Sequence, residues 1–365
     1  MSNSLLEKYE NDRLNLKNRV VMGPMTRSRA TSEHIPTEIM QTYYHQRSGA
    51  GLILTEGVAP SPNGVGYPRI PGIYNQAQTE AWKPITKAVK QEGTKFFMQL
   101  MHTGRISHPD NMPDDARVLA PSAIQPTETK MYVDGKGEEE IPTPEVMSKD
   151  DIENEIQQFV NAAKNAIDAG FDGVEIHGAN GYLVEQFINA GTNQREDEWG
   201  GDDAGRSKFA LAVTQRVAEA IGKDKVGIRL SPNGAFNDIK AFEGQESTFN
   251  YLSKALDQLG ILYIHLVNHE SFGANPLPED IRANIRNNFN GILILSGGYG
   301  HENAQADLDA DKGDLVAFSR PFISNPDLVK RFKEDAELAD PDFNTFYTPG
   351  EEGYIDYPTL EEAKV

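Results

Sequence analysis

Three residues that lie close together in the chain, His177, Asn180 and Tyr182, have side chains suited to polarising an oxygen and delivering a proton. His177 ends a short run at residues 173–177 that is typical of a buried strand, and Asn180 and Tyr182 follow that run. A neutral imidazole and a carboxamide can each donate a hydrogen bond to a carbonyl or nitro oxygen, and a phenol can supply a proton. Taken singly, His177 would more often be a structural histidine. No second histidine or carboxylate lies near enough in sequence to complete a metal site, so we expect no metal.

Three further polar residues lie at or just after the ends of other apolar runs. Thr26, Gln99 and Arg229 supply a hydroxyl, a carboxamide and a permanent cation at the ends of three different runs. A flat heterocycle such as a flavin could use all three, because a guanidinium beside N1 and O2 of the ring stabilises the anion formed on reduction. Ordinary hydrogen bonding at strand ends equally explains Thr26 or Gln99 taken alone.

An anion site is indicated by the last two apolar runs. Gly297 and Gly298 follow the run at 292–295, and Ser319 and Arg320 follow the run at 315–318. A glycine pair after a strand is usually only a turn. At the ends of consecutive late strands, however, glycines, backbone N–H groups and an arginine suit a phosphate.

Eight apolar runs recur along the chain with helical stretches between them. They cover residues 20–22, 52–55, 96–99, 173–177, 226–230, 263–266, 292–295 and 315–318. Strands of this kind, each followed by an amphipathic helix, predict a TIM (β/α)8 barrel of the α/β class, in which the C-terminal strand ends meet at one face. An open doubly wound sheet is the alternative, and no G-x-G-x-x-G motif follows the first run.

The segments between the strands predict helices and one long excursion. Ser148 is expected to cap a helix that stops at Gly170, and further helices are expected at 79–92, 207–221, 248–259 and 325–338. The excursion, residues 101–147, is rich in proline and glycine and predicts a lid or hairpin over the active face. We expect one domain over residues 1–365, with a C-terminal tail at 339–365. His102, the other histidines, Trp82 and Trp199 are interpreted as structural or surface residues.

Composition excludes several classes of function. The chain of 365 residues has 35 Lys and Arg against 55 Asp and Glu, a net charge of −20, so nucleic acid and anionic membranes would be repelled. It has no cysteine, which excludes disulfides, zinc-thiolate sites, iron–sulfur clusters and thiol nucleophiles. No apolar run approaches the roughly 18 residues of a membrane span, and the N-terminus is too charged for a signal peptide. We therefore expect a soluble, cytoplasmic protein with a small-molecule partner.

Several motifs together resemble those of the Old Yellow Enzyme family. The resemblance is carried by residues 18–27 (NRVVMGPMTR), 99–105 (QLMHTGR), 177–182 (HGANGY), 193–195 (NQR), Gly200, Gly201, Arg206, Arg229, 297–298, 318–320 and 353–358. It extends over about residues 13–358 and points to the ene-reductase branch typified by N-ethylmaleimide and pentaerythritol tetranitrate reductases.

The resemblance implies a TIM barrel that binds FMN tightly but non-covalently, takes hydride from NADPH or NADH, and reduces small-molecule activated alkenes. It implies that FMN is held by Pro24, Met25, Thr26, Gly57, Gln99, Arg229, Gly297, Gly298, Ser319 and Arg320. The substrate pocket would be lined by Thr26, Tyr67, Met101, His177, Asn180 and Tyr347. Within it, His177 and Asn180 would bind the electron-withdrawing oxygen, and Tyr182 would protonate the α-carbon while hydride reaches the β-carbon.

Two alternatives remain open at this stage. One is a flavin-free, phosphate-binding barrel enzyme, although no strand end carries the lysine that a Schiff-base aldolase would need. The other is a noncatalytic flavin-binding protein, against which the set of His177, Asn180 and Tyr182 argues. The choice between NADPH and NADH, and between a monomer and a homodimer, is not decided by the sequence.

Overall fold

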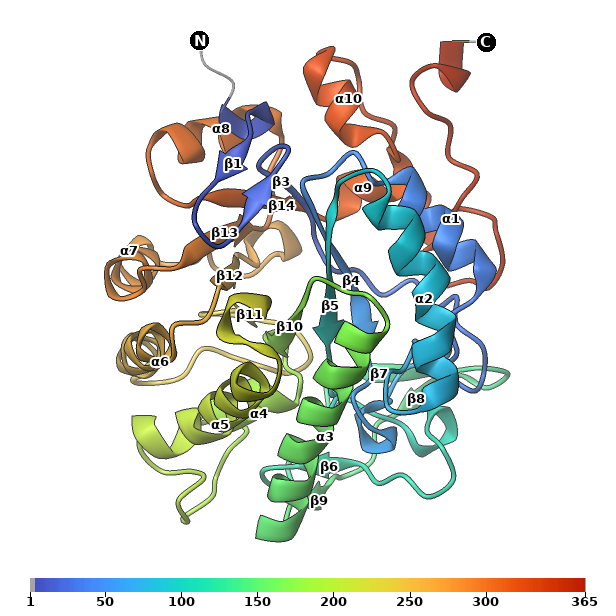
Figure 1. The fold of residues 1–365 in the computed structure, drawn as a ribbon. Coiled ribbons are helices and arrows are strands. Elements are labelled where there is room, and N and C mark those ends of the chain that lie inside the picture. The colour runs from blue at the N-terminus through green and yellow to red at the C-terminus, as the bar shows by residue number, and fades with distance from the viewer. Residues whose placement is uncertain (1–3, 365) are drawn as a thin grey trace.

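Eight parallel strands close into a barrel in the computed structural model, which describes residues 4–364 (Figure 1). The barrel strands are β3 (Val20–Met22), β4 (Leu52–Val58), β5 (Lys95–Leu100), β10 (Gly173–Gly178), β11 (Val226–Leu230), β12 (Tyr263–Val267), β13 (Ile292–Ser296) and β14 (Leu315–Phe318). The ring closes because β5 pairs with both β4 and β10, and β14 pairs with both β13 and β3. The predicted barrel is confirmed, and closure rules out the open sheet.

The barrel strands are buried from end to end, with only Lys95 at the start of β5 half-buried. Each predicted apolar run coincides with a barrel strand to within three residues at either end. The agreement follows from the environment, since a strand covered on both faces reads as a continuous apolar run.

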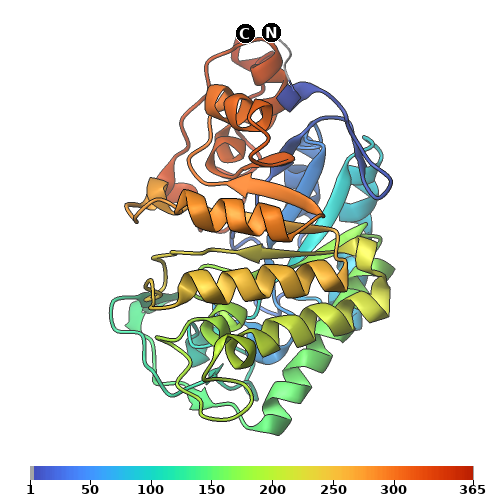
Figure 2. The same cartoon turned by 90° about the vertical axis from the view of Figure 1, so that its left-hand side faces the viewer.

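Helices surround the barrel on its outside, as Figures 1 and 2 show. The longer helices are α1 (Glu38–Gln46), α2 (Gln76–Lys90), α3 (Lys149–Asp168), α5 (Asp203–Ile221), α6 (Gln245–Leu259), α7 (Glu279–Asn288) and α8 (His301–Asp309). Ser148 caps α3 as predicted, accepting a hydrogen bond from the N–H of Asp151, whose carboxylate accepts from the Ser148 N–H in return. No helix within residues 4–364 is long and apolar enough to cross a membrane.

Several helix predictions need correction. Helices α2, α5 and α6 begin three or four residues earlier than predicted, the first two because Asn75 and Asp202 cap them. The helix predicted at 325–338 is wrong: only α10 (Leu328–Lys333) forms there. The helix stops short because the Asn325 side chain hydrogen-bonds both the N–H and the carbonyl of Ala339, fourteen residues later, and the chain folds back on itself. Helices α1, α7 and α8 were not among those predicted.

The excursion at 101–147 contains the antiparallel hairpin of β7 (Lys130–Val133) and β8 (Gly137–Glu140). It packs against the C-terminal ends of the barrel strands, because Met131 belongs to a buried cluster that includes Met101 and Tyr182. At the other end of the barrel, the hairpin of β1 (Tyr9–Glu10) and β2 (Asn15–Leu16) covers the strand starts. The C-terminal tail folds back against the loop that follows β3, where Arg27 donates a hydrogen bond to the carbonyl of Gly353.

Candidate active site

His177 lies near the C-terminal end of β10 and is only 3% exposed. The backbone N–H of Ala179 donates to its Nδ1 over 3.3 Å. Burial, and next the positive charge of Arg229, hold the pKa of His177 well below its ordinary value, so the imidazole is neutral. A neutral imidazole whose Nδ1 accepts must carry its hydrogen on Nε2. His177 therefore presents a hydrogen-bond donor.

Tyr182 stands immediately before the short helix α4 (Leu183–Ile188), with its ring edge-on to His177 at 4.9 Å between centroids. Its hydroxyl lies 3.0 Å from that of Tyr67, and either phenol can be the donor. Burial raises the pKa of Tyr182 to about 12. The hydroxyl is therefore fully protonated near neutral pH, as a proton donor must be.

Asn180 lies between these two residues in the chain, in a left-handed conformation with φ of 59° that asparagine tolerates well. Its N–H donates to Ser231 Oγ at 3.0 Å, and its carbonyl accepts from Asn237 Nδ2 at 2.8 Å. Its side-chain Oδ1 lies 2.8 Å from Nε2 of His269. The loops after β10, β11 and β12 are thus tied together at Asn180.

A row of polar side chains crosses the strand ends beside His177. In strand register, Arg229 lies opposite His177, and Glu175 lies opposite Gln99. Gln99 donates from Nε2 to Glu175 at 2.8 Å, which leaves its own Oε1 available as an acceptor. Burial would raise the pKa of Glu175, but His265 and Arg229 hold it below its ordinary value, so the carboxylate is ionised.

His265 has a buried Nε2 without a hydrogen-bond partner among the described residues, and Arg229, opposite it in strand register, also has a buried donor without a partner. Arg229 is 6% exposed, and among the described residues its buried Nε has no hydrogen-bond partner. A buried donor without a partner is costly and calls for a ligand group. A flavin ring edge, with N1 and O2 as acceptors, fits this donor, and the free Oε1 of Gln99 fits the ring N–H.

The expected phosphate residues lie at the ends of β13 and β14, which are neighbours in the barrel. Gly297 has φ of 111°, and a Cβ there would fall 2.0 Å from the carbonyl oxygen of Asn268, so only glycine fits. Ser319 is half-buried, and the exposed Arg320 begins α9 (Arg320–Ser324). The glycine-formed turn and the serine therefore fit a phosphate group in this loop pair.

The residues expected along the flavin ring lie in the loop after β3 and in β4. Pro24 is buried, whereas Met25 and Thr26 are half-buried in the loop after β3. Gly57 lies in β4 against Met101, where a Cβ would come within 2.4 Å of the Met101 sulfur. The absence of a side chain at Gly57 thus lets Met101 fill the space between β4 and β5.

Tyr67 packs beside the same buried cluster, while Tyr347 is 60% exposed in the C-terminal tail. Tyr347 is held through its carbonyl, which accepts from Arg69. It is the most exposed of the expected pocket residues.

Sequence reasoning missed Glu175, Glu185 and His269. Glu175 could have been found, because it lies two residues before His177 in one strand and therefore on the same face. Glu185 accepts from the N–H of Gly181 and from Ser231, and burial raises its pKa to about 7. His269 comes from a loop, and nothing in its local pattern indicates that it contacts Asn180.

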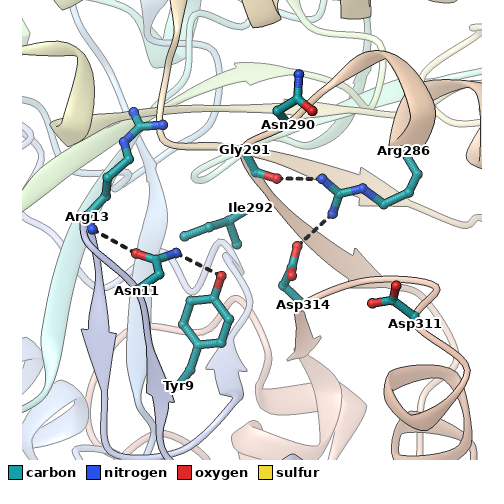
Figure 3. A pocket seen from close by; sticks show the side chains of 9 residues that line it. All are labelled: Tyr9, Asn11, Arg13, Arg286, Asn290, Gly291, Ile292, Asp311 and Asp314. Atoms are coloured by element: carbon teal, nitrogen blue, oxygen red, sulfur yellow. Dashed lines mark hydrogen bonds and ion pairs between the residues drawn. The ribbon is translucent and has the colours of Figure 1, made fainter.

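A hollow of about 240 Å³ opens at the end of the barrel where the strands begin, opposite to His177 and Tyr182 (Figure 3). It lies between the N-terminal hairpin and the starts of β13 and β14. Arg286 in its wall is paired with Asp314 at 2.7 Å, and Arg13 donates to the carbonyl of Gly260. These cations are already used within the chain, so the hollow lacks the unsatisfied donors that mark the C-terminal face.

Comparison with known proteins agrees with this geometry. Residues 10–339 match the model of the NADH:flavin oxidoreductase / NADH oxidase family. A curated relative, 12-oxophytodienoate reductase 7 of Oryza sativa subsp. japonica, is 37% identical over 381 residues, covering 99% of this chain and 95% of its own.

Among solved structures, morphinone reductase superposes with a TM-score of 0.95 at 40% identity, covering 100% of this chain and 98% of its own. The Old Yellow Enzyme homologue from Zymomonas mobilis has a TM-score of 0.92 at 39% identity, covering 98% of this chain and 100% of its own. A structure of morphinone reductase in complex with tetrahydroNAD also matches, with a TM-score of 0.93.

Proposed function

This chain belongs to the Old Yellow Enzyme family of NADH:flavin oxidoreductases, and from that premise we propose how its residues reduce an activated alkene. The protein is an FMN-dependent oxidoreductase that uses a reduced nicotinamide, and its reaction is the reduction of a C=C bond conjugated to an electron-withdrawing oxygen group. The substrates proposed are small enones, maleimides and nitro compounds, with NADPH or NADH as the reductant. We further propose that the enzyme works in the cytoplasm, as a monomer or homodimer.

The FMN site is proposed to follow the strand ends around the barrel. Gly297, Gly298, Ser319 and Arg320 would hold the phosphate, with Pro24, Met25, Thr26 and Gly57 along the ring. Gln99 would accept from the ring N–H, and Arg229 would place its unpartnered Nε beside N1 and O2. When bound, FMN supplies hydride transfer from the nicotinamide to the substrate.

His177 and Asn180 would bind the oxygen of the substrate. Nε2 of His177 is a donor because Nδ1 accepts from Ala179, and a neutral donor polarises a carbonyl without transferring its proton. Drawing electrons toward the oxygen leaves the β-carbon electron-poor, which is the carbon that must accept hydride.

Tyr182 would supply the proton that balances the hydride. The C=C bond gains hydride at the β-carbon and the Tyr182 proton at the α-carbon. The phenolate left on Tyr182 would accept a hydrogen bond from Tyr67, whose hydroxyl lies 3.0 Å away. Tyr67 therefore stabilises the charge left behind until solvent returns a proton. Met101 and Tyr347 would form the pocket wall and rim.

One observation carries this proposal: a neutral imidazole donor and a protonated phenol, 4.9 Å apart between ring centroids, adjoin a buried arginine whose Nε has no partner within residues 4–364. The test is the visible spectrum of the purified protein under anaerobic conditions. We expect a flavin absorption band that bleaches on addition of NADPH and returns on addition of cyclohexenone. A colourless protein that cannot be loaded with FMN, or a reduced flavin that the enone does not reoxidise, would contradict the proposal.

A further inference from the structure

His269 lies in the loop after β12, is 5% exposed, and contacts the side chain of Asn180. We propose that His269 is a positioning residue that fixes the Asn180 amide with its Nδ2 donor facing the substrate oxygen. This inference rests on the proposed function, because it assigns a task to a neighbour of the proposed oxygen-binding pair.

A chain of hydrogen bonds sets the direction of the Asn180 amide. It begins at the backbone N–H of Ala235, which can only donate, and which lies 3.2 Å from His269 Nδ1. With Nδ1 accepting, a neutral imidazole carries its one hydrogen on Nε2. That hydrogen points to Asn180 Oδ1 at 2.8 Å. The oxygen of the amide is therefore committed to His269, and the two Nδ2 hydrogens remain for another partner.

The surroundings of His269 keep this polarity in place. Burial first, and Arg229 second, lower the pKa of His269 to about 4, so the ring stays neutral near pH 7. A protonated Nδ1 would oppose the N–H of Ala235. Glycine at 234 leaves room for the ring, since a Cβ there would lie only 3.1 Å from Nδ1.

The backbone of Asn180 is held separately from its side chain. Ser231 accepts from its N–H, and Asn237 donates to its carbonyl. What these contacts leave undetermined is which end of the amide faces the substrate, since the oxygen and nitrogen ends have nearly the same shape. An amide with Oδ1 toward the substrate would oppose a carbonyl oxygen, so only the fraction in the donor orientation would bind. His269 removes the wrong orientation before the substrate arrives.

The consequence for the pair His177 and Asn180 is that both present N–H groups to one oxygen. Two donors and no acceptor favour carbonyl, nitro and phenolate oxygens over ligands that must donate. Phenol is therefore the probe, because its oxygen can accept from both residues as phenolate and it is not turned over as an alkene.

The experiment is a double-mutant cycle on the FMN-loaded enzyme, with phenol titrated into the oxidised protein and followed by flavin absorbance. The variants are His269→Phe, Asn180→Ala and the two combined, where phenylalanine keeps a ring of similar size without the Nε2 hydrogen. Because His269→Phe removes one neutral hydrogen bond, we expect it to raise the phenol Kd about three- to tenfold. In the Asn180→Ala background the same change should raise Kd less than about twofold, because its target is gone.

The cycle separates positioning from a structural role and from failure of the proposed function. If His269→Phe weakens phenol equally in both backgrounds, His269 only supports the loops and the inference is overturned. If Asn180→Ala weakens phenol but His269→Phe does not, the inference fails while the proposed function stands. If Asn180→Ala leaves phenol binding unchanged, the oxygen-binding role proposed for Asn180 fails first.

A second variant keeps the test valid if His269→Phe does not retain FMN. His269→Asn places an oxygen where Nδ1 was, so it can still accept from Ala235, but its side chain is too short to reach Asn180. It should retain FMN and bind phenol about three- to tenfold more weakly than the wild type, as expected for His269→Phe. This loss corresponds to about 0.6 to 1.4 kcal/mol for one neutral hydrogen bond. Wild-type phenol affinity in FMN-loaded His269→Asn would overturn the inference.

Discussion

Replacing Tyr182 by phenylalanine removes the proposed proton donor and little else. The hydroxyl is bonded to Tyr67 at 3.0 Å, so the change costs about 1 kcal/mol of folding free energy for one neutral hydrogen bond. The phenyl ring keeps its packing against His177 and the buried cluster around Met101. We therefore expect Tyr182→Phe to fold and to retain FMN.

The expected kinetic loss is confined to one half-reaction. A positioned general acid contributes about 10²- to 10⁴-fold, which is about 3 to 5 kcal/mol of transition-state stabilisation. Because the pKa of Tyr182 is raised to about 12, every molecule carries the proton at neutral pH, and the full effect is measurable. Hydride transfer from the nicotinamide to the flavin needs no proton from this residue, so its rate should stay within about twofold.

Anaerobic stopped-flow spectroscopy measures the two half-reactions separately. Bleaching of the flavin by NADPH reports the first, and its return on mixing with cyclohexenone reports the second. Tyr67→Phe is the matched control, because it removes the other hydroxyl of the same pair but leaves the Tyr182 proton, and it should slow reoxidation less than about tenfold. Equal slowing of both half-reactions by Tyr182→Phe, or reoxidation within about threefold of the wild type, would refute the assignment of the acid.

Three other substitutions test the remaining parts of the site. Burial raises the pKa of Glu185 from 4.5 to about 7, so the stability it contributes is present below pH 4.5 and is lost as pH rises through about 7. In urea unfolding, the free energy of unfolding of Glu185→Gln should rise by about 2 kcal/mol relative to that of the wild type between pH 5 and pH 8. A difference between the two proteins that does not change with pH would contradict the raised pKa of Glu185. Gly297→Ala would place a Cβ 2.0 Å from a backbone oxygen at a φ of 111°. Fluorescence titration should show FMN affinity falling about five- to 150-fold, for a strain of about 1 to 3 kcal/mol. Arg229→Met removes a buried charged donor worth about 1.5 to 3 kcal/mol to the reduced flavin, so the two-electron midpoint potential should fall by about 30 to 60 mV, and an unchanged potential would place Arg229 away from the ring.

The sequence predicted the barrel well because its strands are buried on both faces and leave a plain apolar signal. It predicted the strand-end residues for the same reason, since His177, Gln99 and Arg229 each end or adjoin such a run. Helix starts were less predictable, because caps such as Asn75 and Asp202 lie outside the amphipathic pattern.

Contacts between loops were not predictable from local pattern. The helix expected at 325–338 is broken by hydrogen bonds between Asn325 and Ala339, residues fourteen apart in the chain. His269 meets Asn180 across 89 residues, and no periodicity relates a loop after one strand to a loop after another. Glu175 is the intermediate case: its position on the His177 face follows from strand alternation, but its bond to Gln99 depends on strand register.

The position of Arg229 explains how the site combines neutral donors with an anion-stabilising group. Its strongest opposite charge is Glu175, which is ionised, so the cation is compensated within the barrel before any ligand binds. After burial, the same cation is the largest influence lowering the pKa of both His177 and His269. Burial and this cation together keep either imidazole from becoming a second cation. An imidazolium at His177 would compete with the ring edge for negative charge and would bind anions at the substrate end. One buried arginine therefore keeps positive charge at the flavin end and leaves the substrate oxygen to neutral hydrogen bonds and the Tyr182 proton.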